Sequence, residues 1–102
     1  MKRTEIKKLL ESANAGDQVC VKAWVRTKRG SKNVNFIALN DGSTIQNLQL
    51  VAELDVIDDS ILQRIHTGAC ISAEGEIAES QGSGQRIELK ATSIDPPRLS
   101  AL

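Results

Sequence analysis

Aromatic residues are nearly missing from this sequence. Its 102 residues contain one tryptophan, one phenylalanine and no tyrosine. The core of the folded chain must therefore be aliphatic, and each of the two aromatic side chains becomes a candidate for a role of its own. The sequence also lacks any apolar run of about 18 residues, so it contains no transmembrane helix and we expect no membrane partner.

Residues for metal or covalent chemistry are scarce as well. Cys20 and Cys70 have no further cysteine in a CxxC spacing, and His66 is the one histidine. We therefore expect no metal site, and two free thiols rather than a disulfide. No nucleophile and base form a recognisable pattern, so we expect no catalytic residue. Four carboxylates are expected on the surface: Glu74, Glu76, Glu79 and Glu88.

Positive and negative charges are unevenly distributed, although the formal net charge is zero. Residues 1–40 contain nine Lys or Arg and three Asp or Glu, whereas residues 41–102 contain four and ten. This asymmetry indicates a surface that faces a polyanion. The charged start of the chain, MKRTEIKKLLES, is not typical of a secretory signal, and we expect a cytoplasmic protein.

Hydrophobic periodicity predicts two helices and five strands. The first helix, over residues 4–13, begins with Thr4 as its N-cap and ends before Gly16. The second, over residues 58–66, starts with two aspartates that suit the positive end of a helix. Alternation of apolar and polar residues predicts strands over residues 18–28, 33–41, 44–52, 69–78 and 85–94.

The order of these elements is that of the OB-fold, a five-stranded Greek-key barrel. We therefore predict an all-β fold with a helix between its third and fourth strands, in one domain over residues 1–102. A plain α+β sheet is the alternative. Residues 1–16 are expected to be an N-terminal helical extension, and residues 95–102 a linker or tail. Turns are expected at DGS, residues 41–43, and at SQGSG, residues 80–84.

The second and third predicted strands carry the residues that point to a function. Ile37 and Leu39 share one side of the second strand, so Phe36 lies on the other side. In the third strand the same alternation places Gln49 opposite the apolar side. If these strands pair, an aromatic ring lies beside a planar amide, which suits an unstacked base that the ring holds and the amide reads. The alternative is a structural role for Phe36, in a second small core or in a contact under the N-terminal helix.

A basic segment, RTKRGSK at residues 26–32, lies beside this face and contains no acid. Such side chains contact phosphates, and arginine also stacks on bases. Its candidate RNA-binding residues are Arg26, Lys28, Arg29 and Lys32. A solvated loop without a ligand is the alternative. Trp24, just before this segment, is expected to pack at a bend of the first strand rather than to be exposed. An extension of the stacking platform is the alternative, since alternation places Trp24 on the same side of the strand as Arg26.

Three segments resemble the N-terminal anticodon-binding domain of bacterial asparaginyl-tRNA synthetases, the OB-fold shared by the class II aspartyl, asparaginyl and lysyl enzymes. They are AWVRTKRGSKNVNFIALNDGSTIQNLQLV, TGACISAEGEI and SQGSGQRIELKATSI, and the resemblance covers residues 2–94. It implies a tRNA anticodon loop as the partner. It also implies that Phe36 stacks on the middle uridine of the anticodon, that Gln49 reads the same base, and that Arg29 contacts the anticodon.

The same resemblance implies that this chain alone is not an enzyme. In that family the ATP-dependent asparagine–tRNA ligase activity resides in a separate catalytic domain. We therefore expect no cofactor for this chain, with ATP and magnesium confined to a full-length parent, for which a homodimer is also considered. Two alternatives stay open: a free-standing binder of single-stranded nucleic acid, and a protein-interaction or dimerisation domain that uses the first helix or an exposed sheet edge.

Overall fold

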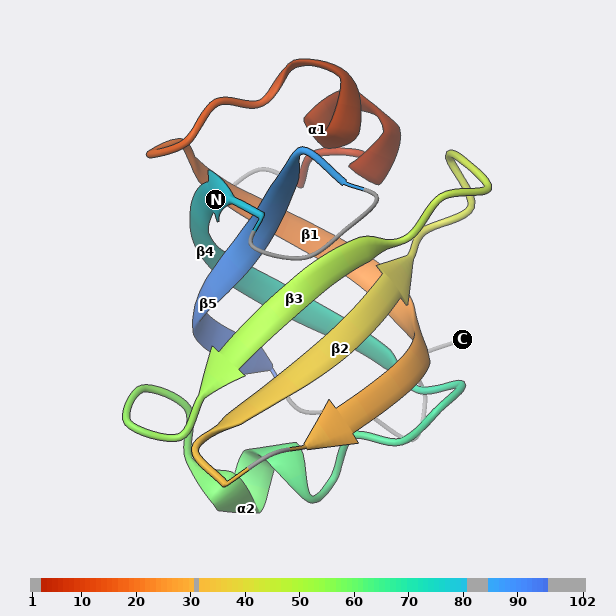
Figure 1. Ribbon diagram of the computed structural model, residues 1–102. Helices are drawn as coiled ribbons and strands as arrows, with labels where there is room; N and C mark the ends of the chain where they lie inside the picture. The colour runs from red at the N-terminus through yellow and green to blue at the C-terminus, as the bar shows by residue number, and fades with distance from the viewer. Residues whose placement is uncertain (1–2, 31, 81–84, 96–102) are drawn as a thin grey trace.

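The computed structural model describes residues 3–30, 32–80 and 85–95. They fold into elements that follow the predicted order (Figure 1): α1 (Ile6–Ser12), β1 (Gln18–Gly30), β2 (Val34–Asn40), β3 (Leu48–Glu53), α2 (Asp59–Leu62), β4 (Cys70–Glu79) and β5 (Ile87–Asp95). Most of the turn predicted at residues 80–84 and of the tail predicted at 95–102 lies outside the described residues.

The five strands close into a barrel in the order β1-β2-β3-β5-β4, with β4 pairing back onto β1. Neighbouring strands are antiparallel except β3 and β5, which pair in parallel through Leu50↔Leu89 and Val51↔Lys90. α2 lies at one end of the barrel and α1 covers the other end (Figure 1). A closed barrel with its helix between β3 and β4 confirms the predicted OB-fold rather than the open α+β sheet.

Aliphatic side chains fill the barrel, as the scarcity of aromatic residues requires. The predicted inward residues of β2 and β3 are all fully buried: Ile37, Leu39, Leu48, Leu50 and Ala52. Ile6 and Leu9 of α1 belong to the same core. Because burial of one such branched side chain contributes roughly 1.5–3 kcal/mol, this interior is the main source of the stability that holds the outer face in place.

A β-bulge interrupts β1, and Arg26 is its extra residue. Before the bulge, Trp24 lies on the outside of the barrel and Val25 is buried. After the bulge the alternation is inverted, so that Thr27 and Arg29 take the outer positions opposite β2. Plain alternation along the strand would have placed Arg29 on the inner side. The bulge also bends the strand, which lets one long β1 pair with both β4 and β2.

The β2–β3 loop, rather than the local sequence, caps the N-terminal end of α1. Glu5 occupies the N-cap position, but its side chain makes no capping hydrogen bond. Instead, Oδ2 of Asp41 accepts a hydrogen bond from the backbone N–H of Ile6 (2.9 Å). Oγ of Ser43 accepts another from the N–H of Lys7 (3.0 Å). A segment far along the chain therefore satisfies two of the N–H groups that are free at the start of the helix.

Both helices are shorter than the sequence predicts. Thr4 is not the N-cap, because its N–H donates to the carbonyl of Cys20 (2.8 Å) and the chain before α1 runs beside β1. α2 ends at Leu62 rather than at His66. Beyond Leu62 the chain continues in tighter turns, with Ile65 N donating to Leu62 O (3.1 Å), a spacing typical of a 3₁₀-helix.

Replacing Asp41 by alanine is expected to destabilise the fold by about 1 kcal/mol at neutral pH, the usual effect of removing a helix cap. Burial raises the pKa of Asp41, but hydrogen bonds from the Ser43 hydroxyl and from the N–H groups of Ile6 and Ser43 lower it below the ordinary 3.8. The stabilisation is therefore complete above pH 3.8 and is lost as the pH falls through the lower pKa of the folded state.

Urea unfolding of the wild type and of Asp41→Ala at several pH values measures this effect. The difference in unfolding free energy should shrink below pH 3.8. Asp55→Ala, at an exposed aspartate in the turn after β3, is the matched control and should show a much smaller difference at neutral pH. A difference that stays constant down to low pH would contradict the role of the ionised carboxylate.

Candidate nucleic-acid interface

The outer face of β1, β2 and β3 carries the aromatic ring that the sequence singles out. In the strand pairing, Phe36 of β2 lies between Arg29 of β1 and Val51 of β3. The guanidinium carbon of Arg29 is 5.7 Å from the centre of the Phe36 ring, which is within the range of a cation–π contact. Phe36 is half-buried, so part of its surface stays open to a ligand.

Gln49 lies on the same face as a diagonal neighbour of Phe36, because it pairs with Ala38 two positions along β2. Its Nε2 donates a hydrogen bond to Oε1 of Glu88 in β5 (3.3 Å). The contact therefore orients the amide, with its nitrogen toward β5.

Glu88 is 5% exposed, so the expectation of a surface carboxylate is wrong at this position. Its side chain does lie on the outer side of β5, since the neighbouring Leu89 points inward and pairs with Leu50. The parallel pairing of β3 with β5 brings Gln49 directly beside it. Alternation correctly predicts that Glu88 lies on the outer side of β5. It does not predict that the neighbouring strand β3 buries this side chain.

Asn40 ends β2 and organises the loop that leads to β3. Its Nδ2 donates to the carbonyl oxygens of Thr44 and Gln46, and its Oδ1 accepts from the N–H of Gly42 (2.8 Å). Gly42 has φ 84°, in the left-handed region that glycine adopts without strain. The connection therefore runs over residues 41–47 and delays β3 to Leu48, four residues later than predicted, but it is well ordered by hydrogen bonds.

The basic segment divides into residues that face solvent and one that does not. Lys28 is turned toward α2, where its Nζ donates to the carbonyl oxygens of Leu62 and Ile65. This contact places a positive charge at the negative end of the helix. The structure gives Lys28 an internal role, so we leave it out of the interface proposed below. The other three residues are exposed: Arg26, Arg29 and Lys32.

Trp24 is 43% exposed, which contradicts the expectation that it packs away from solvent. Its neighbours in β1, Ala23 and Val25, are buried, so alternation places the indole on the outside of the barrel. There it lies opposite Asn40 of β2 and Cys70 of β4. Both aromatic residues of the chain are thus accessible on the outer surface.

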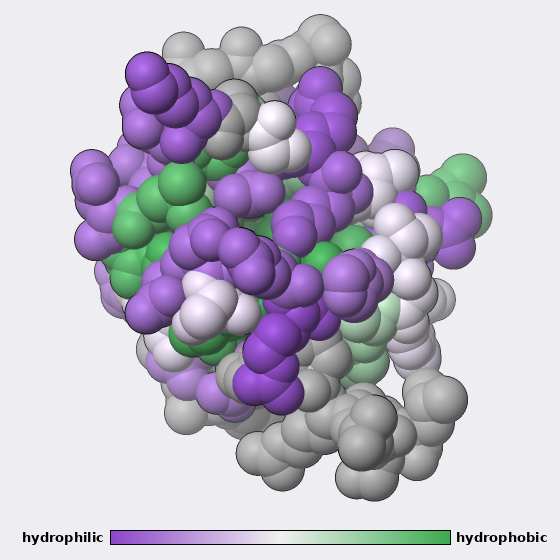
Figure 2. Space-filling view, turned by 90° about the horizontal axis from the view of Figure 1, so that it is seen from below, coloured by the Kyte–Doolittle hydropathy of each residue, from purple (hydrophilic) through white to green (hydrophobic). Residues whose placement is uncertain are grey.

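The end of the barrel that carries α2 is strongly hydrophilic. Figure 2 views the molecule from this end, where the connection between β1 and β2 also lies (Figure 1). Among the coloured residues in this view, hydrophilic side chains predominate, and the apolar areas lie between them. Such a surface suits a charged, hydrated ligand better than a large apolar partner.

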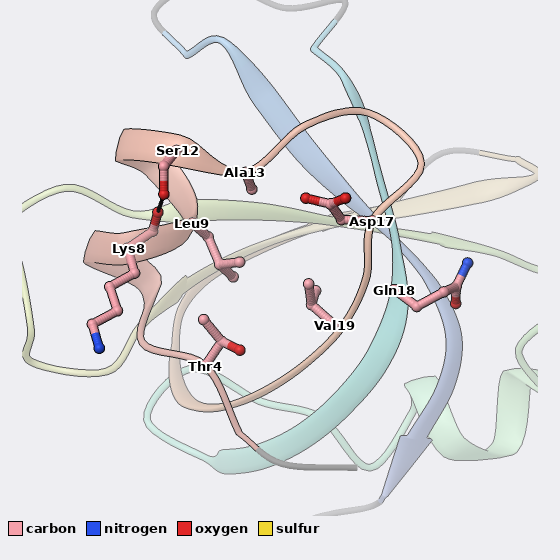
Figure 3. A pocket seen from close by; sticks show the side chains of 8 residues that line it. All are labelled: Thr4, Lys8, Leu9, Ser12, Ala13, Asp17, Gln18 and Val19. Atoms are coloured by element: carbon pink, nitrogen blue, oxygen red, sulfur yellow. Dashed lines mark hydrogen bonds between the residues drawn. The ribbon is translucent and has the colours of Figure 1, made fainter.

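A separate hollow lies between α1 and the start of β1 (Figure 3). It contains none of the predicted site residues, and it combines one lysine and one aspartate with apolar side chains. Its lining consists of Thr4, Lys8, Leu9, Ser12, Ala13, Asp17, Gln18 and Val19. This mixed lining carries no excess of positive charge for a nucleic acid.

The described part of the chain shows no feature of a metal centre or a membrane span. Among residues 3–30, 32–80 and 85–95, no three His, Cys, Asp or Glu side chains come together in a way that could hold a metal ion. No helix within these same ranges is long and apolar enough to cross a membrane. Cys20 is buried and Cys70 half-buried, and both are free thiols.

Comparison with known proteins identifies the family. The family model described as an OB-fold nucleic acid binding domain, with the name tRNA anti-codon, matches residues 19–97. The chain belongs to this family. An asparagine–tRNA ligase from Phocaeicola vulgatus is 57% identical over 93 residues, which make up 91% of this chain and 20% of that protein. This agrees with the resemblance to asparaginyl-tRNA synthetases that the sequence shows.

Solved structures of the same OB-fold agree with the barrel. Asparaginyl-tRNA synthetase from Pyrococcus horikoshii, complexed with asparaginyl-adenylate, matches with a TM-score of 0.80 at 14% identity, over 94% of this chain and 22% of that chain. At this identity the likeness shows the fold alone. Aspartyl tRNA synthetase from Entamoeba histolytica matches with a TM-score of 0.75 at 26% identity. The match covers 91% of this chain and 20% of that chain. The chain spans about a fifth of the length of the curated relatives that it matches.

Proposed function

We propose that this chain binds the anticodon loop of a tRNA as the recognition part of an asparagine–tRNA ligase. The observation that carries the proposal is the juxtaposition of Arg29, Phe36 and Gln49 on one outer face, set by the register of β1, β2 and β3. The family and the relatives named above support it. In this proposal the ligase reaction, with its ATP and magnesium, belongs to the rest of a longer parent protein.

Phe36 supplies the stacking surface for one base. A base that stacks on an aromatic side chain contributes roughly 1–3 kcal/mol to binding. The ring is reached only by a base that has left its own stack, which favours a single-stranded loop over a duplex. Arg29 lies close enough to the ring to reach the phosphate of the same nucleotide or to stack beside the base.

Gln49 supplies the reading of that base. Glu88 holds one N–H of the amide, so the carbonyl oxygen and the second N–H remain for a ligand. Uridine offers an N–H donor next to a carbonyl acceptor on its Watson–Crick edge, which matches this pair. Cytidine offers the reverse pattern, and turning the amide over to fit it would place the amide oxygen against the buried carboxylate of Glu88. We therefore propose that the middle base of the anticodon is read as uridine.

A stem-loop with uridine in the middle of the anticodon should bind about tenfold more tightly than one with cytidine, since the hydrogen bonds at stake are worth about 1.4 kcal/mol. Gln49→Ala should remove most of this preference but keep the stacking. Gln46→Ala, at an exposed glutamine in the β2–β3 loop, is the matched control and should retain the preference. Fluorescence anisotropy of labelled stem-loops at a fixed salt concentration measures the affinities of the wild type and of the two variants.

Two other outcomes would change the proposal. Equal binding of the two stem-loops by the wild type would contradict base reading and favour the binder of single strands without sequence preference. No binding to either stem-loop, even at low salt, would contradict the proposal as a whole and favour a protein-interaction domain. Because phosphate contacts release counterions, true binding should also weaken as the salt concentration rises.

A further inference from the structure

The second aromatic residue of the chain lies on the same outer face as Phe36. Trp24 pairs with Asn40, and Asn40 shares the outer side of β2 with Phe36 because Ile37 and Leu39 between them are buried. The sequence contains no other aromatic residue. A chain that builds its core without aromatic rings thus places both of its rings on one accessible surface, and only Phe36 has been given a role above.

The surroundings of Trp24 form a surface hollow of about 340 Å³, lined by Trp24, Val25, Arg26, Thr67 and Gly68. The connection between α2 and β4 makes its second wall, held to β1 by hydrogen bonds from Gly68 N to Val25 O (2.7 Å) and from Val25 N to Ala69 O (2.8 Å). Arg26, the bulge residue, is exposed at this position. The hollow therefore combines an indole, a guanidinium group and a rigid backbone wall.

We propose that Trp24 and Arg26 form a second nucleotide subsite, which takes an unstacked base of the same RNA strand that places a base on Phe36. An indole offers a large stacking surface, and a neighbouring guanidinium group suits the phosphate of the stacked nucleotide. This inference rests on the proposed function, because it assumes that an RNA strand crosses the face. It adds a contact to a second base of the strand, besides the base that Gln49 reads.

The spacing between the two rings fits this arrangement. Phe36 and Asn40 are four residues apart in β2, or about 13 Å at roughly 3.3 Å per residue, and Trp24 lies beside Asn40. Neighbouring stacked bases are about 3.4 Å apart along one strand. The second base therefore lies within about four nucleotides of the first, and closer in sequence where the RNA backbone is extended.

Tryptophan fluorescence tests the subsite directly, since Trp24 is the one tryptophan of the chain. The unmodified protein is titrated with a labelled RNA of about nine nucleotides that has a central uridine, long enough to reach about four nucleotides to each side. Label anisotropy reports binding, and Trp24 emission reports stacking on the indole. We expect emission to be quenched with the same midpoint as the rise in anisotropy.

Abasic substitutions in the RNA and variants of Trp24 then locate the contact. One abasic position beside the central uridine should abolish most of the quenching and weaken binding roughly 5- to 150-fold, the range that corresponds to loss of one stacked base. Trp24→Leu should weaken binding by a similar factor, and Trp24→Phe should restore most of it. Melting temperatures of both variants show whether any loss comes from unfolding.

The outcomes separate this inference from the proposed function. Binding without quenching, with all flanking abasic RNAs bound equally well, would overturn the subsite and leave the anticodon-binding proposal standing. No change in anisotropy at all would overturn the proposed function itself. If Trp24→Leu fails to fold, the quenching and the abasic series in the unmodified protein still decide the question.

Discussion

Replacing Phe36 by leucine is expected to weaken binding of an anticodon stem-loop by roughly 100-fold. Loss of one base–aromatic stack accounts for about 1–3 kcal/mol, with tenfold in affinity for each 1.4 kcal/mol, and the base that is no longer held is also lost to Gln49. Leucine still covers the neighbouring buried Val51. The fold should lose little beyond the cation–π contact with Arg29, worth about 0.5–1 kcal/mol at an exposed site.

Phe36→Tyr is the matched control for this experiment, because it keeps the ring and changes only its edge. The affinity of Phe36→Tyr should stay close to that of the wild type, whereas the affinity of Phe36→Leu should fall. Anisotropy titrations at one fixed salt concentration give the affinities, and thermal unfolding shows that both variants are folded. Wild-type affinity in Phe36→Leu would contradict the stacking role and return Phe36 to the alternative of a small satellite core.

Replacing Gly75 by alanine is expected to destabilise the protein by about 3 kcal/mol or more, a large part of the stability of a small domain. Gly75 lies in β4, next to a bulge in the pairing with β5. A Cβ at this position would lie 2.0 Å from the carbonyl oxygen of Lys90 and 3.0 Å from Cα of Ala91. Both are backbone atoms, so only a shift of β5 away from β4 relieves the clash.

Gly16→Ala separates this effect from the ordinary conformational freedom of glycine. Gly16 has φ 98°, and a Cβ added there would meet no atom within 4 Å, so its replacement should cost about 1 kcal/mol from backbone strain alone. Gly75 has no positive φ. Glycine is needed there because the backbone of β5 leaves no room for a Cβ. Urea unfolding should give a far lower midpoint for Gly75→Ala, and its melting temperature should fall by roughly 12–24 °C. Equal stability of the two variants would contradict the clash.

Much of the barrel follows from local patterns in the sequence. Alternation in β2 and β3 identifies the buried residues because each strand has one face in the core and one outside. It also places Phe36 and Gln49 on the outer side, since no bulge interrupts either strand between them. The aliphatic composition explains why both aromatic residues are left for the surface. Strand order and the position of α2 then fix the fold class.

The remaining features depend on contacts between residues far apart in the sequence. The bulge at Arg26 inverts the faces of β1, and no glycine or proline marks it. The predicted strand ends at Lys28, and alternation continued beyond it would give the wrong side for Arg29. The basic segment and the family resemblance place Arg29 near the face, whereas the strand pattern does not. Glu88 is buried because β3 lies beside it. Lys28 is turned toward α2 because the carbonyl oxygens of Leu62 and Ile65 accept hydrogen bonds from its ammonium group. The residue pattern of one β-strand contains no information about the strands and turns that pack beside it.

The segment shared by the family is smaller than the unit that folds. The family match begins at Val19, but Ile6 is completely buried, and its helix is anchored on Asp41 and Ser43 at the end of β2. A fragment cut at the start of the match would open an aliphatic hole in one end of the barrel and leave this anchor without its helix. Transferring the outer face of β1, β2 and β3 to another protein therefore requires α1 to be transferred with the barrel.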